Sequence, residues 1–345
     1  MSSPALVEVR KCFPEHRVVL LTIQSSDKVQ RDKVAQYAGD IQRMPWIELV
    51  MPHLVDEVVT LKDVSDLRYL WGLRRYLCAY RFEAAIAMSD VWASWTGRWK
   101  KRLLLYFLIG PIPVMGWRGA SDPHRLRRSG LLKHHVHGPL QFLSEMAPPR
   151  EYKDTDLVFD LRPGSDAIRW VAAWINRCSL LEQRLVVIAP GSLQPHKCWP
   201  ETSFRTLIET LLSKYNDIAI VIVGTPKDYN LGERLVRSAP NRVFNLAGKS
   251  DIAQSAALMA RSVLVVGNDG GAMHLADAMG AKVVSLVPGI EYPDSVEPWH
   301  NKELAIRWPV KCAPCYSFTS CPEGHNKCMK EIPVSVVLDK CASNL

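Results

Sequence analysis

A series of short, almost wholly apolar runs in the second half of the chain places the strongest constraint on the fold. The runs alternate with segments in which apolar residues recur at helical spacing. Strands this apolar are buried on both faces, which is typical of a parallel sheet that is covered by helices on each side. The predicted strands span residues 185–189, 218–223, 243–246, 263–266 and 283–287, and the predicted helices span 201–215, 229–238, 252–260 and 272–279.

The first half shows the same alternation in a weaker form. Its predicted strands span residues 17–23, 57–61 and 82–87, and its predicted helices span 5–13 and 66–80. Strand, helix and strand in this order predict a second parallel sheet. Because 345 residues are too many for one small core, we predict an α/β protein with two Rossmann-like domains whose parallel sheets face a cleft.

The predicted domains comprise residues 1–170 and 183–330, with a C-terminal tail at 331–345 and a connection between Gly164 and Gln183. The first residues form no charged and apolar leader. No apolar run reaches the roughly 18 residues that a membrane-spanning helix needs. We therefore expect the chain in the cytoplasm.

The formal net charge of +8 predicts an anionic partner, for which nucleic acid, an anionic membrane face and a phosphorylated substrate all qualify. A basic and aromatic run at 98–102 precedes the apolar residues 103–109. This run is either a contact with an anionic membrane surface or the solvated start of a buried helix. Three nearby histidines lack a supporting metal-ligand pattern, and we expect His134, His135 and His137 to face solvent.

The segment 267–274 (GNDGGAMH) carries the sharpest functional signal. It follows a predicted strand and opens a predicted helix, where ligands bind in open parallel sheets and where helix amides favour phosphate. Gly270 and Gly271 let a ligand approach the backbone closely. Asp269 is expected to accept from a sugar hydroxyl or to orient the turn, and His274 is expected to donate to a phosphate oxygen.

Two further loops follow predicted strands at the same sheet edge. In the first, Ser192 is expected to hydrogen-bond a phosphate and Lys197 to supply the charge that a leaving diphosphate needs. In the second, Asp228 is either a contact to a nucleoside ribose or part of a plain turn. Asp154 and Asp156 fit the Asp-x-Asp pattern of metal-dependent transferases, but they lie far from these loops in sequence and are expected in a solvated turn.

Four cysteines lie in one short segment near the C-terminus, with His325 among them. Thiolates at such spacing are able to close a tetrahedral zinc or iron site. The alternative is a set of reduced, partly buried thiols. The four residues are Cys312, Cys315, Cys321 and Cys328.

The second half resembles the heptosyltransferase family in the runs VVIAPGS, IVIVGTPKD, LAGKSDIAQSAALMARSVLVVGNDGGAMHLADAMG and VVSLVPG. This resemblance implies a GT-B fold and inverting transfer from ADP-heptose to a lipopolysaccharide-type or other glycan acceptor. Lys197 and Ser192 then match residues that face the donor diphosphate, and Asp228 falls near an acidic ribose contact. The donor-binding pattern Asp-x-Gly-x-x-His falls on Asp269, Gly270, Gly271 and His274. Transfer of this type needs no metal, because helix dipoles and basic side chains balance the diphosphate charge.

The chain departs from the family pattern at its start. Family members begin with a strand and a Gly-Asp loop, whose Asp is the proposed base, before the helix that matches SPALVEVRKCF here. We therefore expect the first strand and this base to be missing, with Asp27 and Asp90 as possible replacements. The resemblance leaves two alternatives, a sugar-nucleotide-binding protein with weak or no catalysis and a nucleotide-sugar epimerase. It favours peripheral contact with the inner membrane over binding of nucleic acid.

Overall fold

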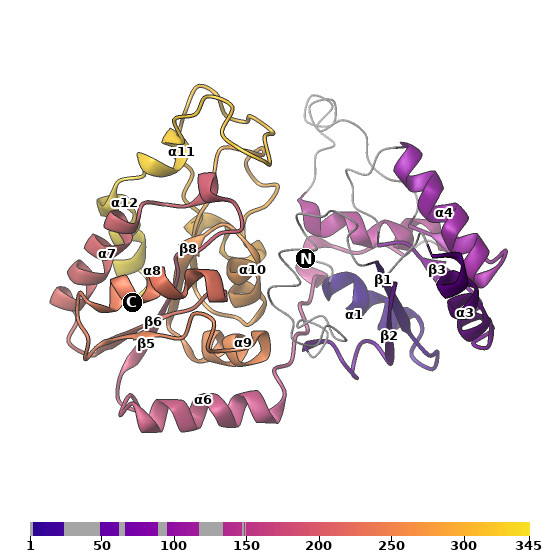
Figure 1. The fold of residues 1–345 in the computed structure, drawn as a ribbon, viewed down its shortest axis with the longest axis horizontal. Coiled ribbons are helices and arrows are strands. Elements are labelled where there is room, and N and C mark those ends of the chain that lie inside the picture. The colour runs from indigo at the N-terminus through magenta and orange to yellow at the C-terminus, as the bar shows by residue number, and fades with distance from the viewer. Residues whose placement is uncertain are drawn as a thin grey trace. The chain divides into compact units, whose positions relative to one another are not determined.

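The computed structural model describes residues 3–23, 49–61, 66–88, 95–116, 134–146, 148 and 150–345 (Figure 1). The chain divides into two compact units, Met1–Asp160 and Leu161–Leu345. Asp27 and Asp90 lie outside the described residues. Within the described ranges, no helix combines the length and the apolar character that crossing a bilayer requires.

A five-stranded parallel sheet forms the centre of the second unit, with the strand order β7-β6-β5-β8-β9 (Figure 1). The register pairs Val187 of β5 with Val221 of β6 and with Val265 of β8. All five strands were predicted from the sequence, and their bounds are Arg184–Ala189 (β5), Ile218–Ile222 (β6), Val243–Asn245 (β7), Leu264–Asn268 (β8) and Val283–Leu286 (β9).

The strand order contains a switch point between β5 and β8. From β5 the chain runs outward through β6 to β7, and it then returns to the other side of β5 to form β8 and β9. Right-handed crossovers place the helices of the two halves on opposite faces of the sheet. Ligands of such sheets bind beyond the carboxyl ends of the strands at the switch point. A ligand site is therefore expected at the loops after β5 and β8.

Helices cover the sheet in two groups. One group joins α7 to α8 and α12, and the other joins α9 to α6 and α10. The helix bounds are Ser165–Arg177 (α6), Glu201–Lys214 (α7), Tyr229–Val236 (α8), Ile252–Arg261 (α9), Gly271–Ala278 (α10), Lys327–Lys330 (α11) and Val334–Ala342 (α12). Helix α6 occupies the segment that the sequence suggested as the connection between domains.

One part of the core of this unit lies between the sheet and α7. Val186, Ile220 and Val266 are fully buried on the strands, and Phe204 and Leu207 meet them from α7. A continuous apolar strand buries side chains on both faces, so the sheet orders the loops at its carboxyl edge.

The first unit contains two separate pairs of parallel strands. Strand β3 covers only Ala85–Ile86, which is much shorter than the predicted strand at 82–87. The other elements are α1 (Ser3–Cys12), β1 (Val19–Ile23), β2 (Glu57–Leu61), α3 (Leu67–Cys78), α4 (Trp95–Ile109), β4 (Val114–Met115) and the 3₁₀ helices His135–Glu145 and Asp154–Asp156.

The expectation that the three histidines face solvent is wrong for His134, which is only 5% exposed. Its Nδ1 accepts a hydrogen bond from the backbone N–H of Val136 at 3.2 Å and caps the following 3₁₀ helix. His137 is also largely covered, and its Nδ1 lies 3.0 Å from the hydroxyl of Tyr152. Capping and packing, which leave no simple pattern in sequence, decide the burial of these side chains. Asp154 and Asp156 are exposed, as predicted.

Candidate functional site

Lys197 and Asp269 meet at the switch point of the sheet. Lys197 ends the 3₁₀ turn Pro195–Lys197 after β5, and Asp269 directly follows β8. The Lys197 Nζ lies 3.5 Å from the Asp269 Oδ2, and the two side chains are 17% and 8% exposed. A partly buried ammonium group at this edge is able to balance the charge of an anionic ligand.

Asn268 connects the two loops. Its Nδ2 donates to the carbonyl of Pro190 at 2.7 Å, and its Oδ1 accepts from the backbone N–H of Trp199 at 2.9 Å. The Trp199 indole is itself buried and donates to the carbonyl of Ile332 at 3.0 Å. These bonds fix both ends of the segment that carries Lys197, so Asn268 is a positioning residue that the sequence analysis missed.

Asp228 lies against the loop after β5. Its Oδ2 accepts from the backbone N–H and the hydroxyl of Thr225, at 2.8 and 2.7 Å. A Cβ placed on Gly191 would lie 2.2 Å from the Asp228 Oδ1. Glycine is therefore required at position 191 to admit this carboxylate. The structure thus brings Asp228 beside the β5 loop, while the Thr225 bonds also give it the turn role that the sequence left open.

His274 lies in the first turns of α10, and its Nε2 is 3.9 Å from the Asp269 Oδ1. Burial lowers the pKa of His274, and this effect outweighs the opposing attraction of Asp269. The imidazole is therefore neutral near pH 7, in a state that is able to donate one hydrogen bond.

Gly270 and Gly271 form the turn into α10. A Cβ on Gly271 would meet no heavy atom within 4 Å, and one on Gly270 would meet only the carbonyl of Asn268 at 3.9 Å. The packing of the protein itself therefore does not demand glycine at either position. Ser192 is half-buried in the neighbouring loop, where its hydroxyl accepts from the backbone N–H of Gln194 at 3.4 Å.

Glu291 adds a carboxyl group that the sequence analysis did not identify. It lies in the loop after β9, is 8% exposed, and interacts electrostatically with Lys197 and Asp269. Burial raises its pKa to about 7, a shift that Asp269 increases and Lys197 opposes. Arg307 holds the loop, because it donates to the backbone carbonyls of Pro288 and Glu291 at 3.1 and 2.9 Å.

In the described part of the chain, no group of three or more His, Cys, Asp or Glu side chains is placed to hold an ion, and the metal centre at the four cysteines stays a prediction. The Cys312 Sγ lies 3.9 Å from the His325 Nε2. Burial raises the pKa of Cys328, whereas backbone N–H groups overcome the burial of Cys321 and lower its pKa. All four cysteines are half-buried, and none of them forms a disulfide.

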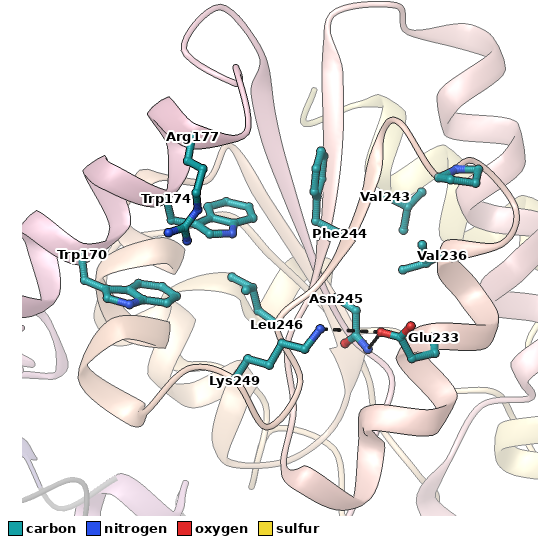
Figure 2. A pocket seen from close by; sticks show the side chains of 11 residues that line it. Trp170, Trp174, Arg177, Glu233, Val236, Val243, Phe244, Asn245, Leu246 and Lys249 are labelled. Carbon is teal, nitrogen blue, oxygen red and sulfur yellow. Dashed lines mark hydrogen bonds and ion pairs between the residues drawn. The ribbon is translucent and has the colours of Figure 1, made fainter.

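A separate groove of about 440 Å³ runs along the outer edge of β7 (Figure 2). Trp174 of α6 meets Phe244 of β7 edge to face, with ring centroids 5.8 Å apart. At the other end, the Nδ2 of Asn245 donates to Glu233 at 2.7 Å, and Lys249 lies 3.7 Å from the same carboxylate. None of the predicted donor residues lines this groove.

Comparison with known proteins places these features in one family. Residues 70–325 match the model of glycosyltransferase family 9 (heptosyltransferase). Lipooligosaccharide heptosyltransferase 2 of Haemophilus influenzae is 30% identical over 138 residues, which cover 38% of this chain and 39% of the relative. Lipopolysaccharide heptosyltransferase 2 of Escherichia coli is also 30% identical over 138 residues, which cover 38% of this chain and 39% of the relative. The match thus spans about two fifths of these curated relatives.

Solved structures extend the likeness over the whole chain at the level of fold. A glycosyltransferase family 9 protein from Veillonella parvula superposes with a TM-score of 0.72 at 16% identity, covering 99% of this chain and 92% of that one. E. coli ADP-heptose lipopolysaccharide heptosyltransferase II superposes with a TM-score of 0.63 at 19% identity, covering 99% of this chain and 93% of that one. E. coli heptosyltransferase WaaC with ADP superposes with a TM-score of 0.63 at 17% identity, covering 100% of this chain and 95% of that one.

These superpositions confirm the predicted α/β class and the GT-B fold of the heptosyltransferases. The family model covers well over half of the chain and includes every residue of the switch-point site. The chain therefore belongs to glycosyltransferase family 9, the heptosyltransferase family.

Proposed function

We propose that the chain is an inverting glycosyltransferase that moves a sugar from a nucleotide diphosphate donor to a glycan. The observation that carries the proposal is the convergence of Lys197, Asp269 and His274 at the switch point of the second sheet. A cation, a neutral histidine and the start of a helix at one edge suit a diphosphate. Membership of family 9 supports the same reading.

The proposed donor is ADP-heptose. The curated relatives are named heptosyltransferases, and the structure of E. coli heptosyltransferase WaaC was solved with ADP. Asp228 is proposed to accept from a ribose hydroxyl, since its Oδ1 lies against the backbone of the β5 loop. The proposed diphosphate contacts are Ser192, Lys197, the backbone amides of Gly270 and Gly271, and His274.

In the proposed reaction, an acceptor hydroxyl attacks the anomeric carbon from the face opposite the diphosphate. The new C–O bond forms as the bond to the diphosphate oxygen breaks, and the acceptor proton passes to a base. Lys197 and the N–H of His274 balance the charge that develops on the leaving diphosphate, so no metal cofactor is required. Asp27 and Asp90 are the sequence-based candidates for the base.

The proposed acceptor is a lipopolysaccharide-type glycan or another glycolipid, reached from the cytoplasmic side of the inner membrane. The relatives are named for lipopolysaccharide and lipooligosaccharide, which supports this class. The net charge of +8 suits an acceptor that carries phosphate groups.

Incubation of the full chain with ADP-heptose and a heptose-deficient lipooligosaccharide, in buffer with EDTA, tests the proposal. Mass spectrometry should find one added heptose on the acceptor, and NMR of the product should show inverted anomeric configuration. Isomerisation of the donor without acceptor would instead establish an epimerase. Calorimetric binding of the donor without transfer to any acceptor of a glycolipid panel would establish a binding protein. Each of these two results would overturn the proposal.

A further inference from the structure

Helices α3 and α4 pack against each other in the first unit (Figure 1). Both helices carry large apolar side chains that are exposed. On α4, Trp99, Leu103 and Tyr106 are 45%, 64% and 58% exposed. These three residues follow one another at i, i+4 and i+7, so they lie on one stripe of the helix. On α3, Leu67 and Trp71 are 70% and 57% exposed and are also spaced i, i+4. We call these five side chains the α3–α4 surface.

The packing between the two helices rests mainly on side chains outside the α3–α4 surface. Their packing uses a different set of side chains, in which Leu70, Leu77 and Leu108 are buried. The exposed indole of Trp71 does contact the edge of the Phe107 ring, with centroids 5.6 Å apart. This contact joins the α3 part of the surface to α4. Both helices therefore expose apolar and aromatic side chains beyond those that their own core buries.

Cationic side chains are interleaved with these rings. The Arg74 guanidinium lies over the rings of Trp71 and Phe107, at 5.9 and 5.3 Å from their centroids. Arg102 lies 5.6 Å from the centroid of Trp99. Neither helix contains an Asp or a Glu, and the exposed cations of the two helices also include Arg68, Arg75, Lys100 and Lys101.

We propose that the α3–α4 surface docks on an anionic lipid bilayer. Aromatic and leucine side chains enter the headgroup region, while arginine and lysine side chains around them meet lipid phosphates. The absence of acidic residues from both helices favours this occupant over a second copy of the chain, because a symmetric contact would bring the same cations together. The proposal deepens the proposed function, since a glycolipid acceptor lies in such a bilayer, but lipid binding is measured without any sugar transfer.

The test is sedimentation of the full chain with vesicles of phosphatidylglycerol and phosphatidylcholine, and with vesicles of phosphatidylcholine alone. We expect binding to the anionic vesicles, and we expect added salt to weaken it. Lys100→Gln/Lys101→Gln should lower the partition coefficient roughly fivefold for each charge removed. Trp99→Ser/Leu103→Ser should lower it roughly tenfold.

Ile168→Ser/Leu181→Ser is the matched control, because Ile168 and Leu181 are 54% and 59% exposed in the second unit. This control should bind vesicles as the unmodified chain does, and circular dichroism should show that all variants are folded. Equal binding by the control and the Trp99/Leu103 variant would overturn the proposal. So would concentration-dependent dimerisation that Trp99→Ser/Leu103→Ser abolishes while vesicle binding stays absent. Neither outcome depends on whether the chain transfers a sugar.

Discussion

The Nζ of Lys197 lies 3.5 Å from the Oδ2 of Asp269, although these residues come from loops after different strands. The distance depends on Asn268, which bonds both ends of the loop that carries Lys197. A buried amide therefore holds the two loops of the site together. A substitution of this neutral side chain changes the geometry of the site without changing its charge.

Replacement of Asn268 by alanine should disturb both folding and binding. The change leaves the N–H of Trp199 and the carbonyl of Pro190 without their partner, at a cost of about 1–3 kcal/mol in the free energy of unfolding. The Lys197 loop should also loosen, and calorimetry should find weaker binding of ADP.

Asn301→Ala provides the control for this experiment. Asn301 is also buried, donates to the carbonyl of Ala281 and to the Asp277 carboxylate, and accepts from the N–H of Val283, at the opposite end of the sheet. Asn301→Ala should lose at least as much stability as Asn268→Ala and keep its affinity for ADP. Equal loss of ADP affinity in both variants would mean that general destabilisation, and not the loop geometry, controls binding.

Gly191→Ala should displace the Asp228 carboxylate, because the new Cβ would lie 2.2 Å from its Oδ1. If Asp228 contacts the ribose, affinity for ADP should fall by about 1–3 kcal/mol while affinity for inorganic diphosphate changes little. Gly164→Ala is the control, since a Cβ there meets nothing within 4 Å. An equal loss for ADP and diphosphate would remove the case for a ribose contact.

Gly271→Ala should separate binding from stability. Its Cβ meets no protein atom within 4 Å, and alanine favours the helix by up to about 1 kcal/mol. Thermal unfolding should therefore show equal or higher stability, while ADP binding falls because the methyl group keeps the diphosphate from the backbone. Gly72→Ala, on exposed α3, should raise stability in the same way without altering ADP binding. Unchanged affinity in Gly271→Ala would place the diphosphate elsewhere.

Glu291 should make the stability of the second unit depend on pH. Its pKa is raised to about 7 by burial, with Asp269 and Glu297 adding to the shift and Lys197 and Arg307 opposing it. A carboxyl group with a raised pKa stabilises the fold fully below its unfolded pKa, and this contribution is lost as the pH rises through the folded pKa.

We therefore expect Glu291→Gln to unfold much as the unmodified chain does near pH 5 and to be more stable by about 1–3 kcal/mol at pH 8. Urea unfolding followed from pH 5 to pH 8 measures this difference. ADP brings further negative charge, so its binding to the unmodified chain should take up a proton near pH 7, and Glu291→Gln should abolish that uptake. Parallel stability profiles for the two proteins would contradict the buried, protonated state of Glu291.

The second sheet is readable from sequence because its strands are continuously apolar. A run such as 218–222 has apolar side chains on both faces, so both faces must be buried. In a parallel sheet, the loops that follow such strands gather at one edge. This is why the proximity of Lys197 to Asp269 was predictable. Strand β3 was predicted too long, because residues 82–84 pair with no strand in the described part of the chain.

Asn268 and Glu291 were missed for different reasons. Asn268 acts by bonding groups far away in sequence, which no local pattern reports. Glu291 stands beside Tyr292 and Pro293, in a segment that reads as a solvated turn, and only the fold buries it. The cysteine segment illustrates a further limit, because spacing in sequence does not determine how the thiols are arranged in space; among the described residues, no group of three or more His, Cys, Asp or Glu side chains is placed to hold an ion.

Calorimetric titration of the full chain with ADP tests whether Lys197 at the switch point binds a nucleotide diphosphate. The unmodified chain should bind ADP in the presence of EDTA. Lys197→Ala should weaken binding by about 1.5–3 kcal/mol, as expected for a hydrogen bond to a charged group. Lys282→Ala, an exposed lysine just before β9, should bind ADP normally. Equal ADP affinity in the unmodified chain and Lys197→Ala would contradict the account.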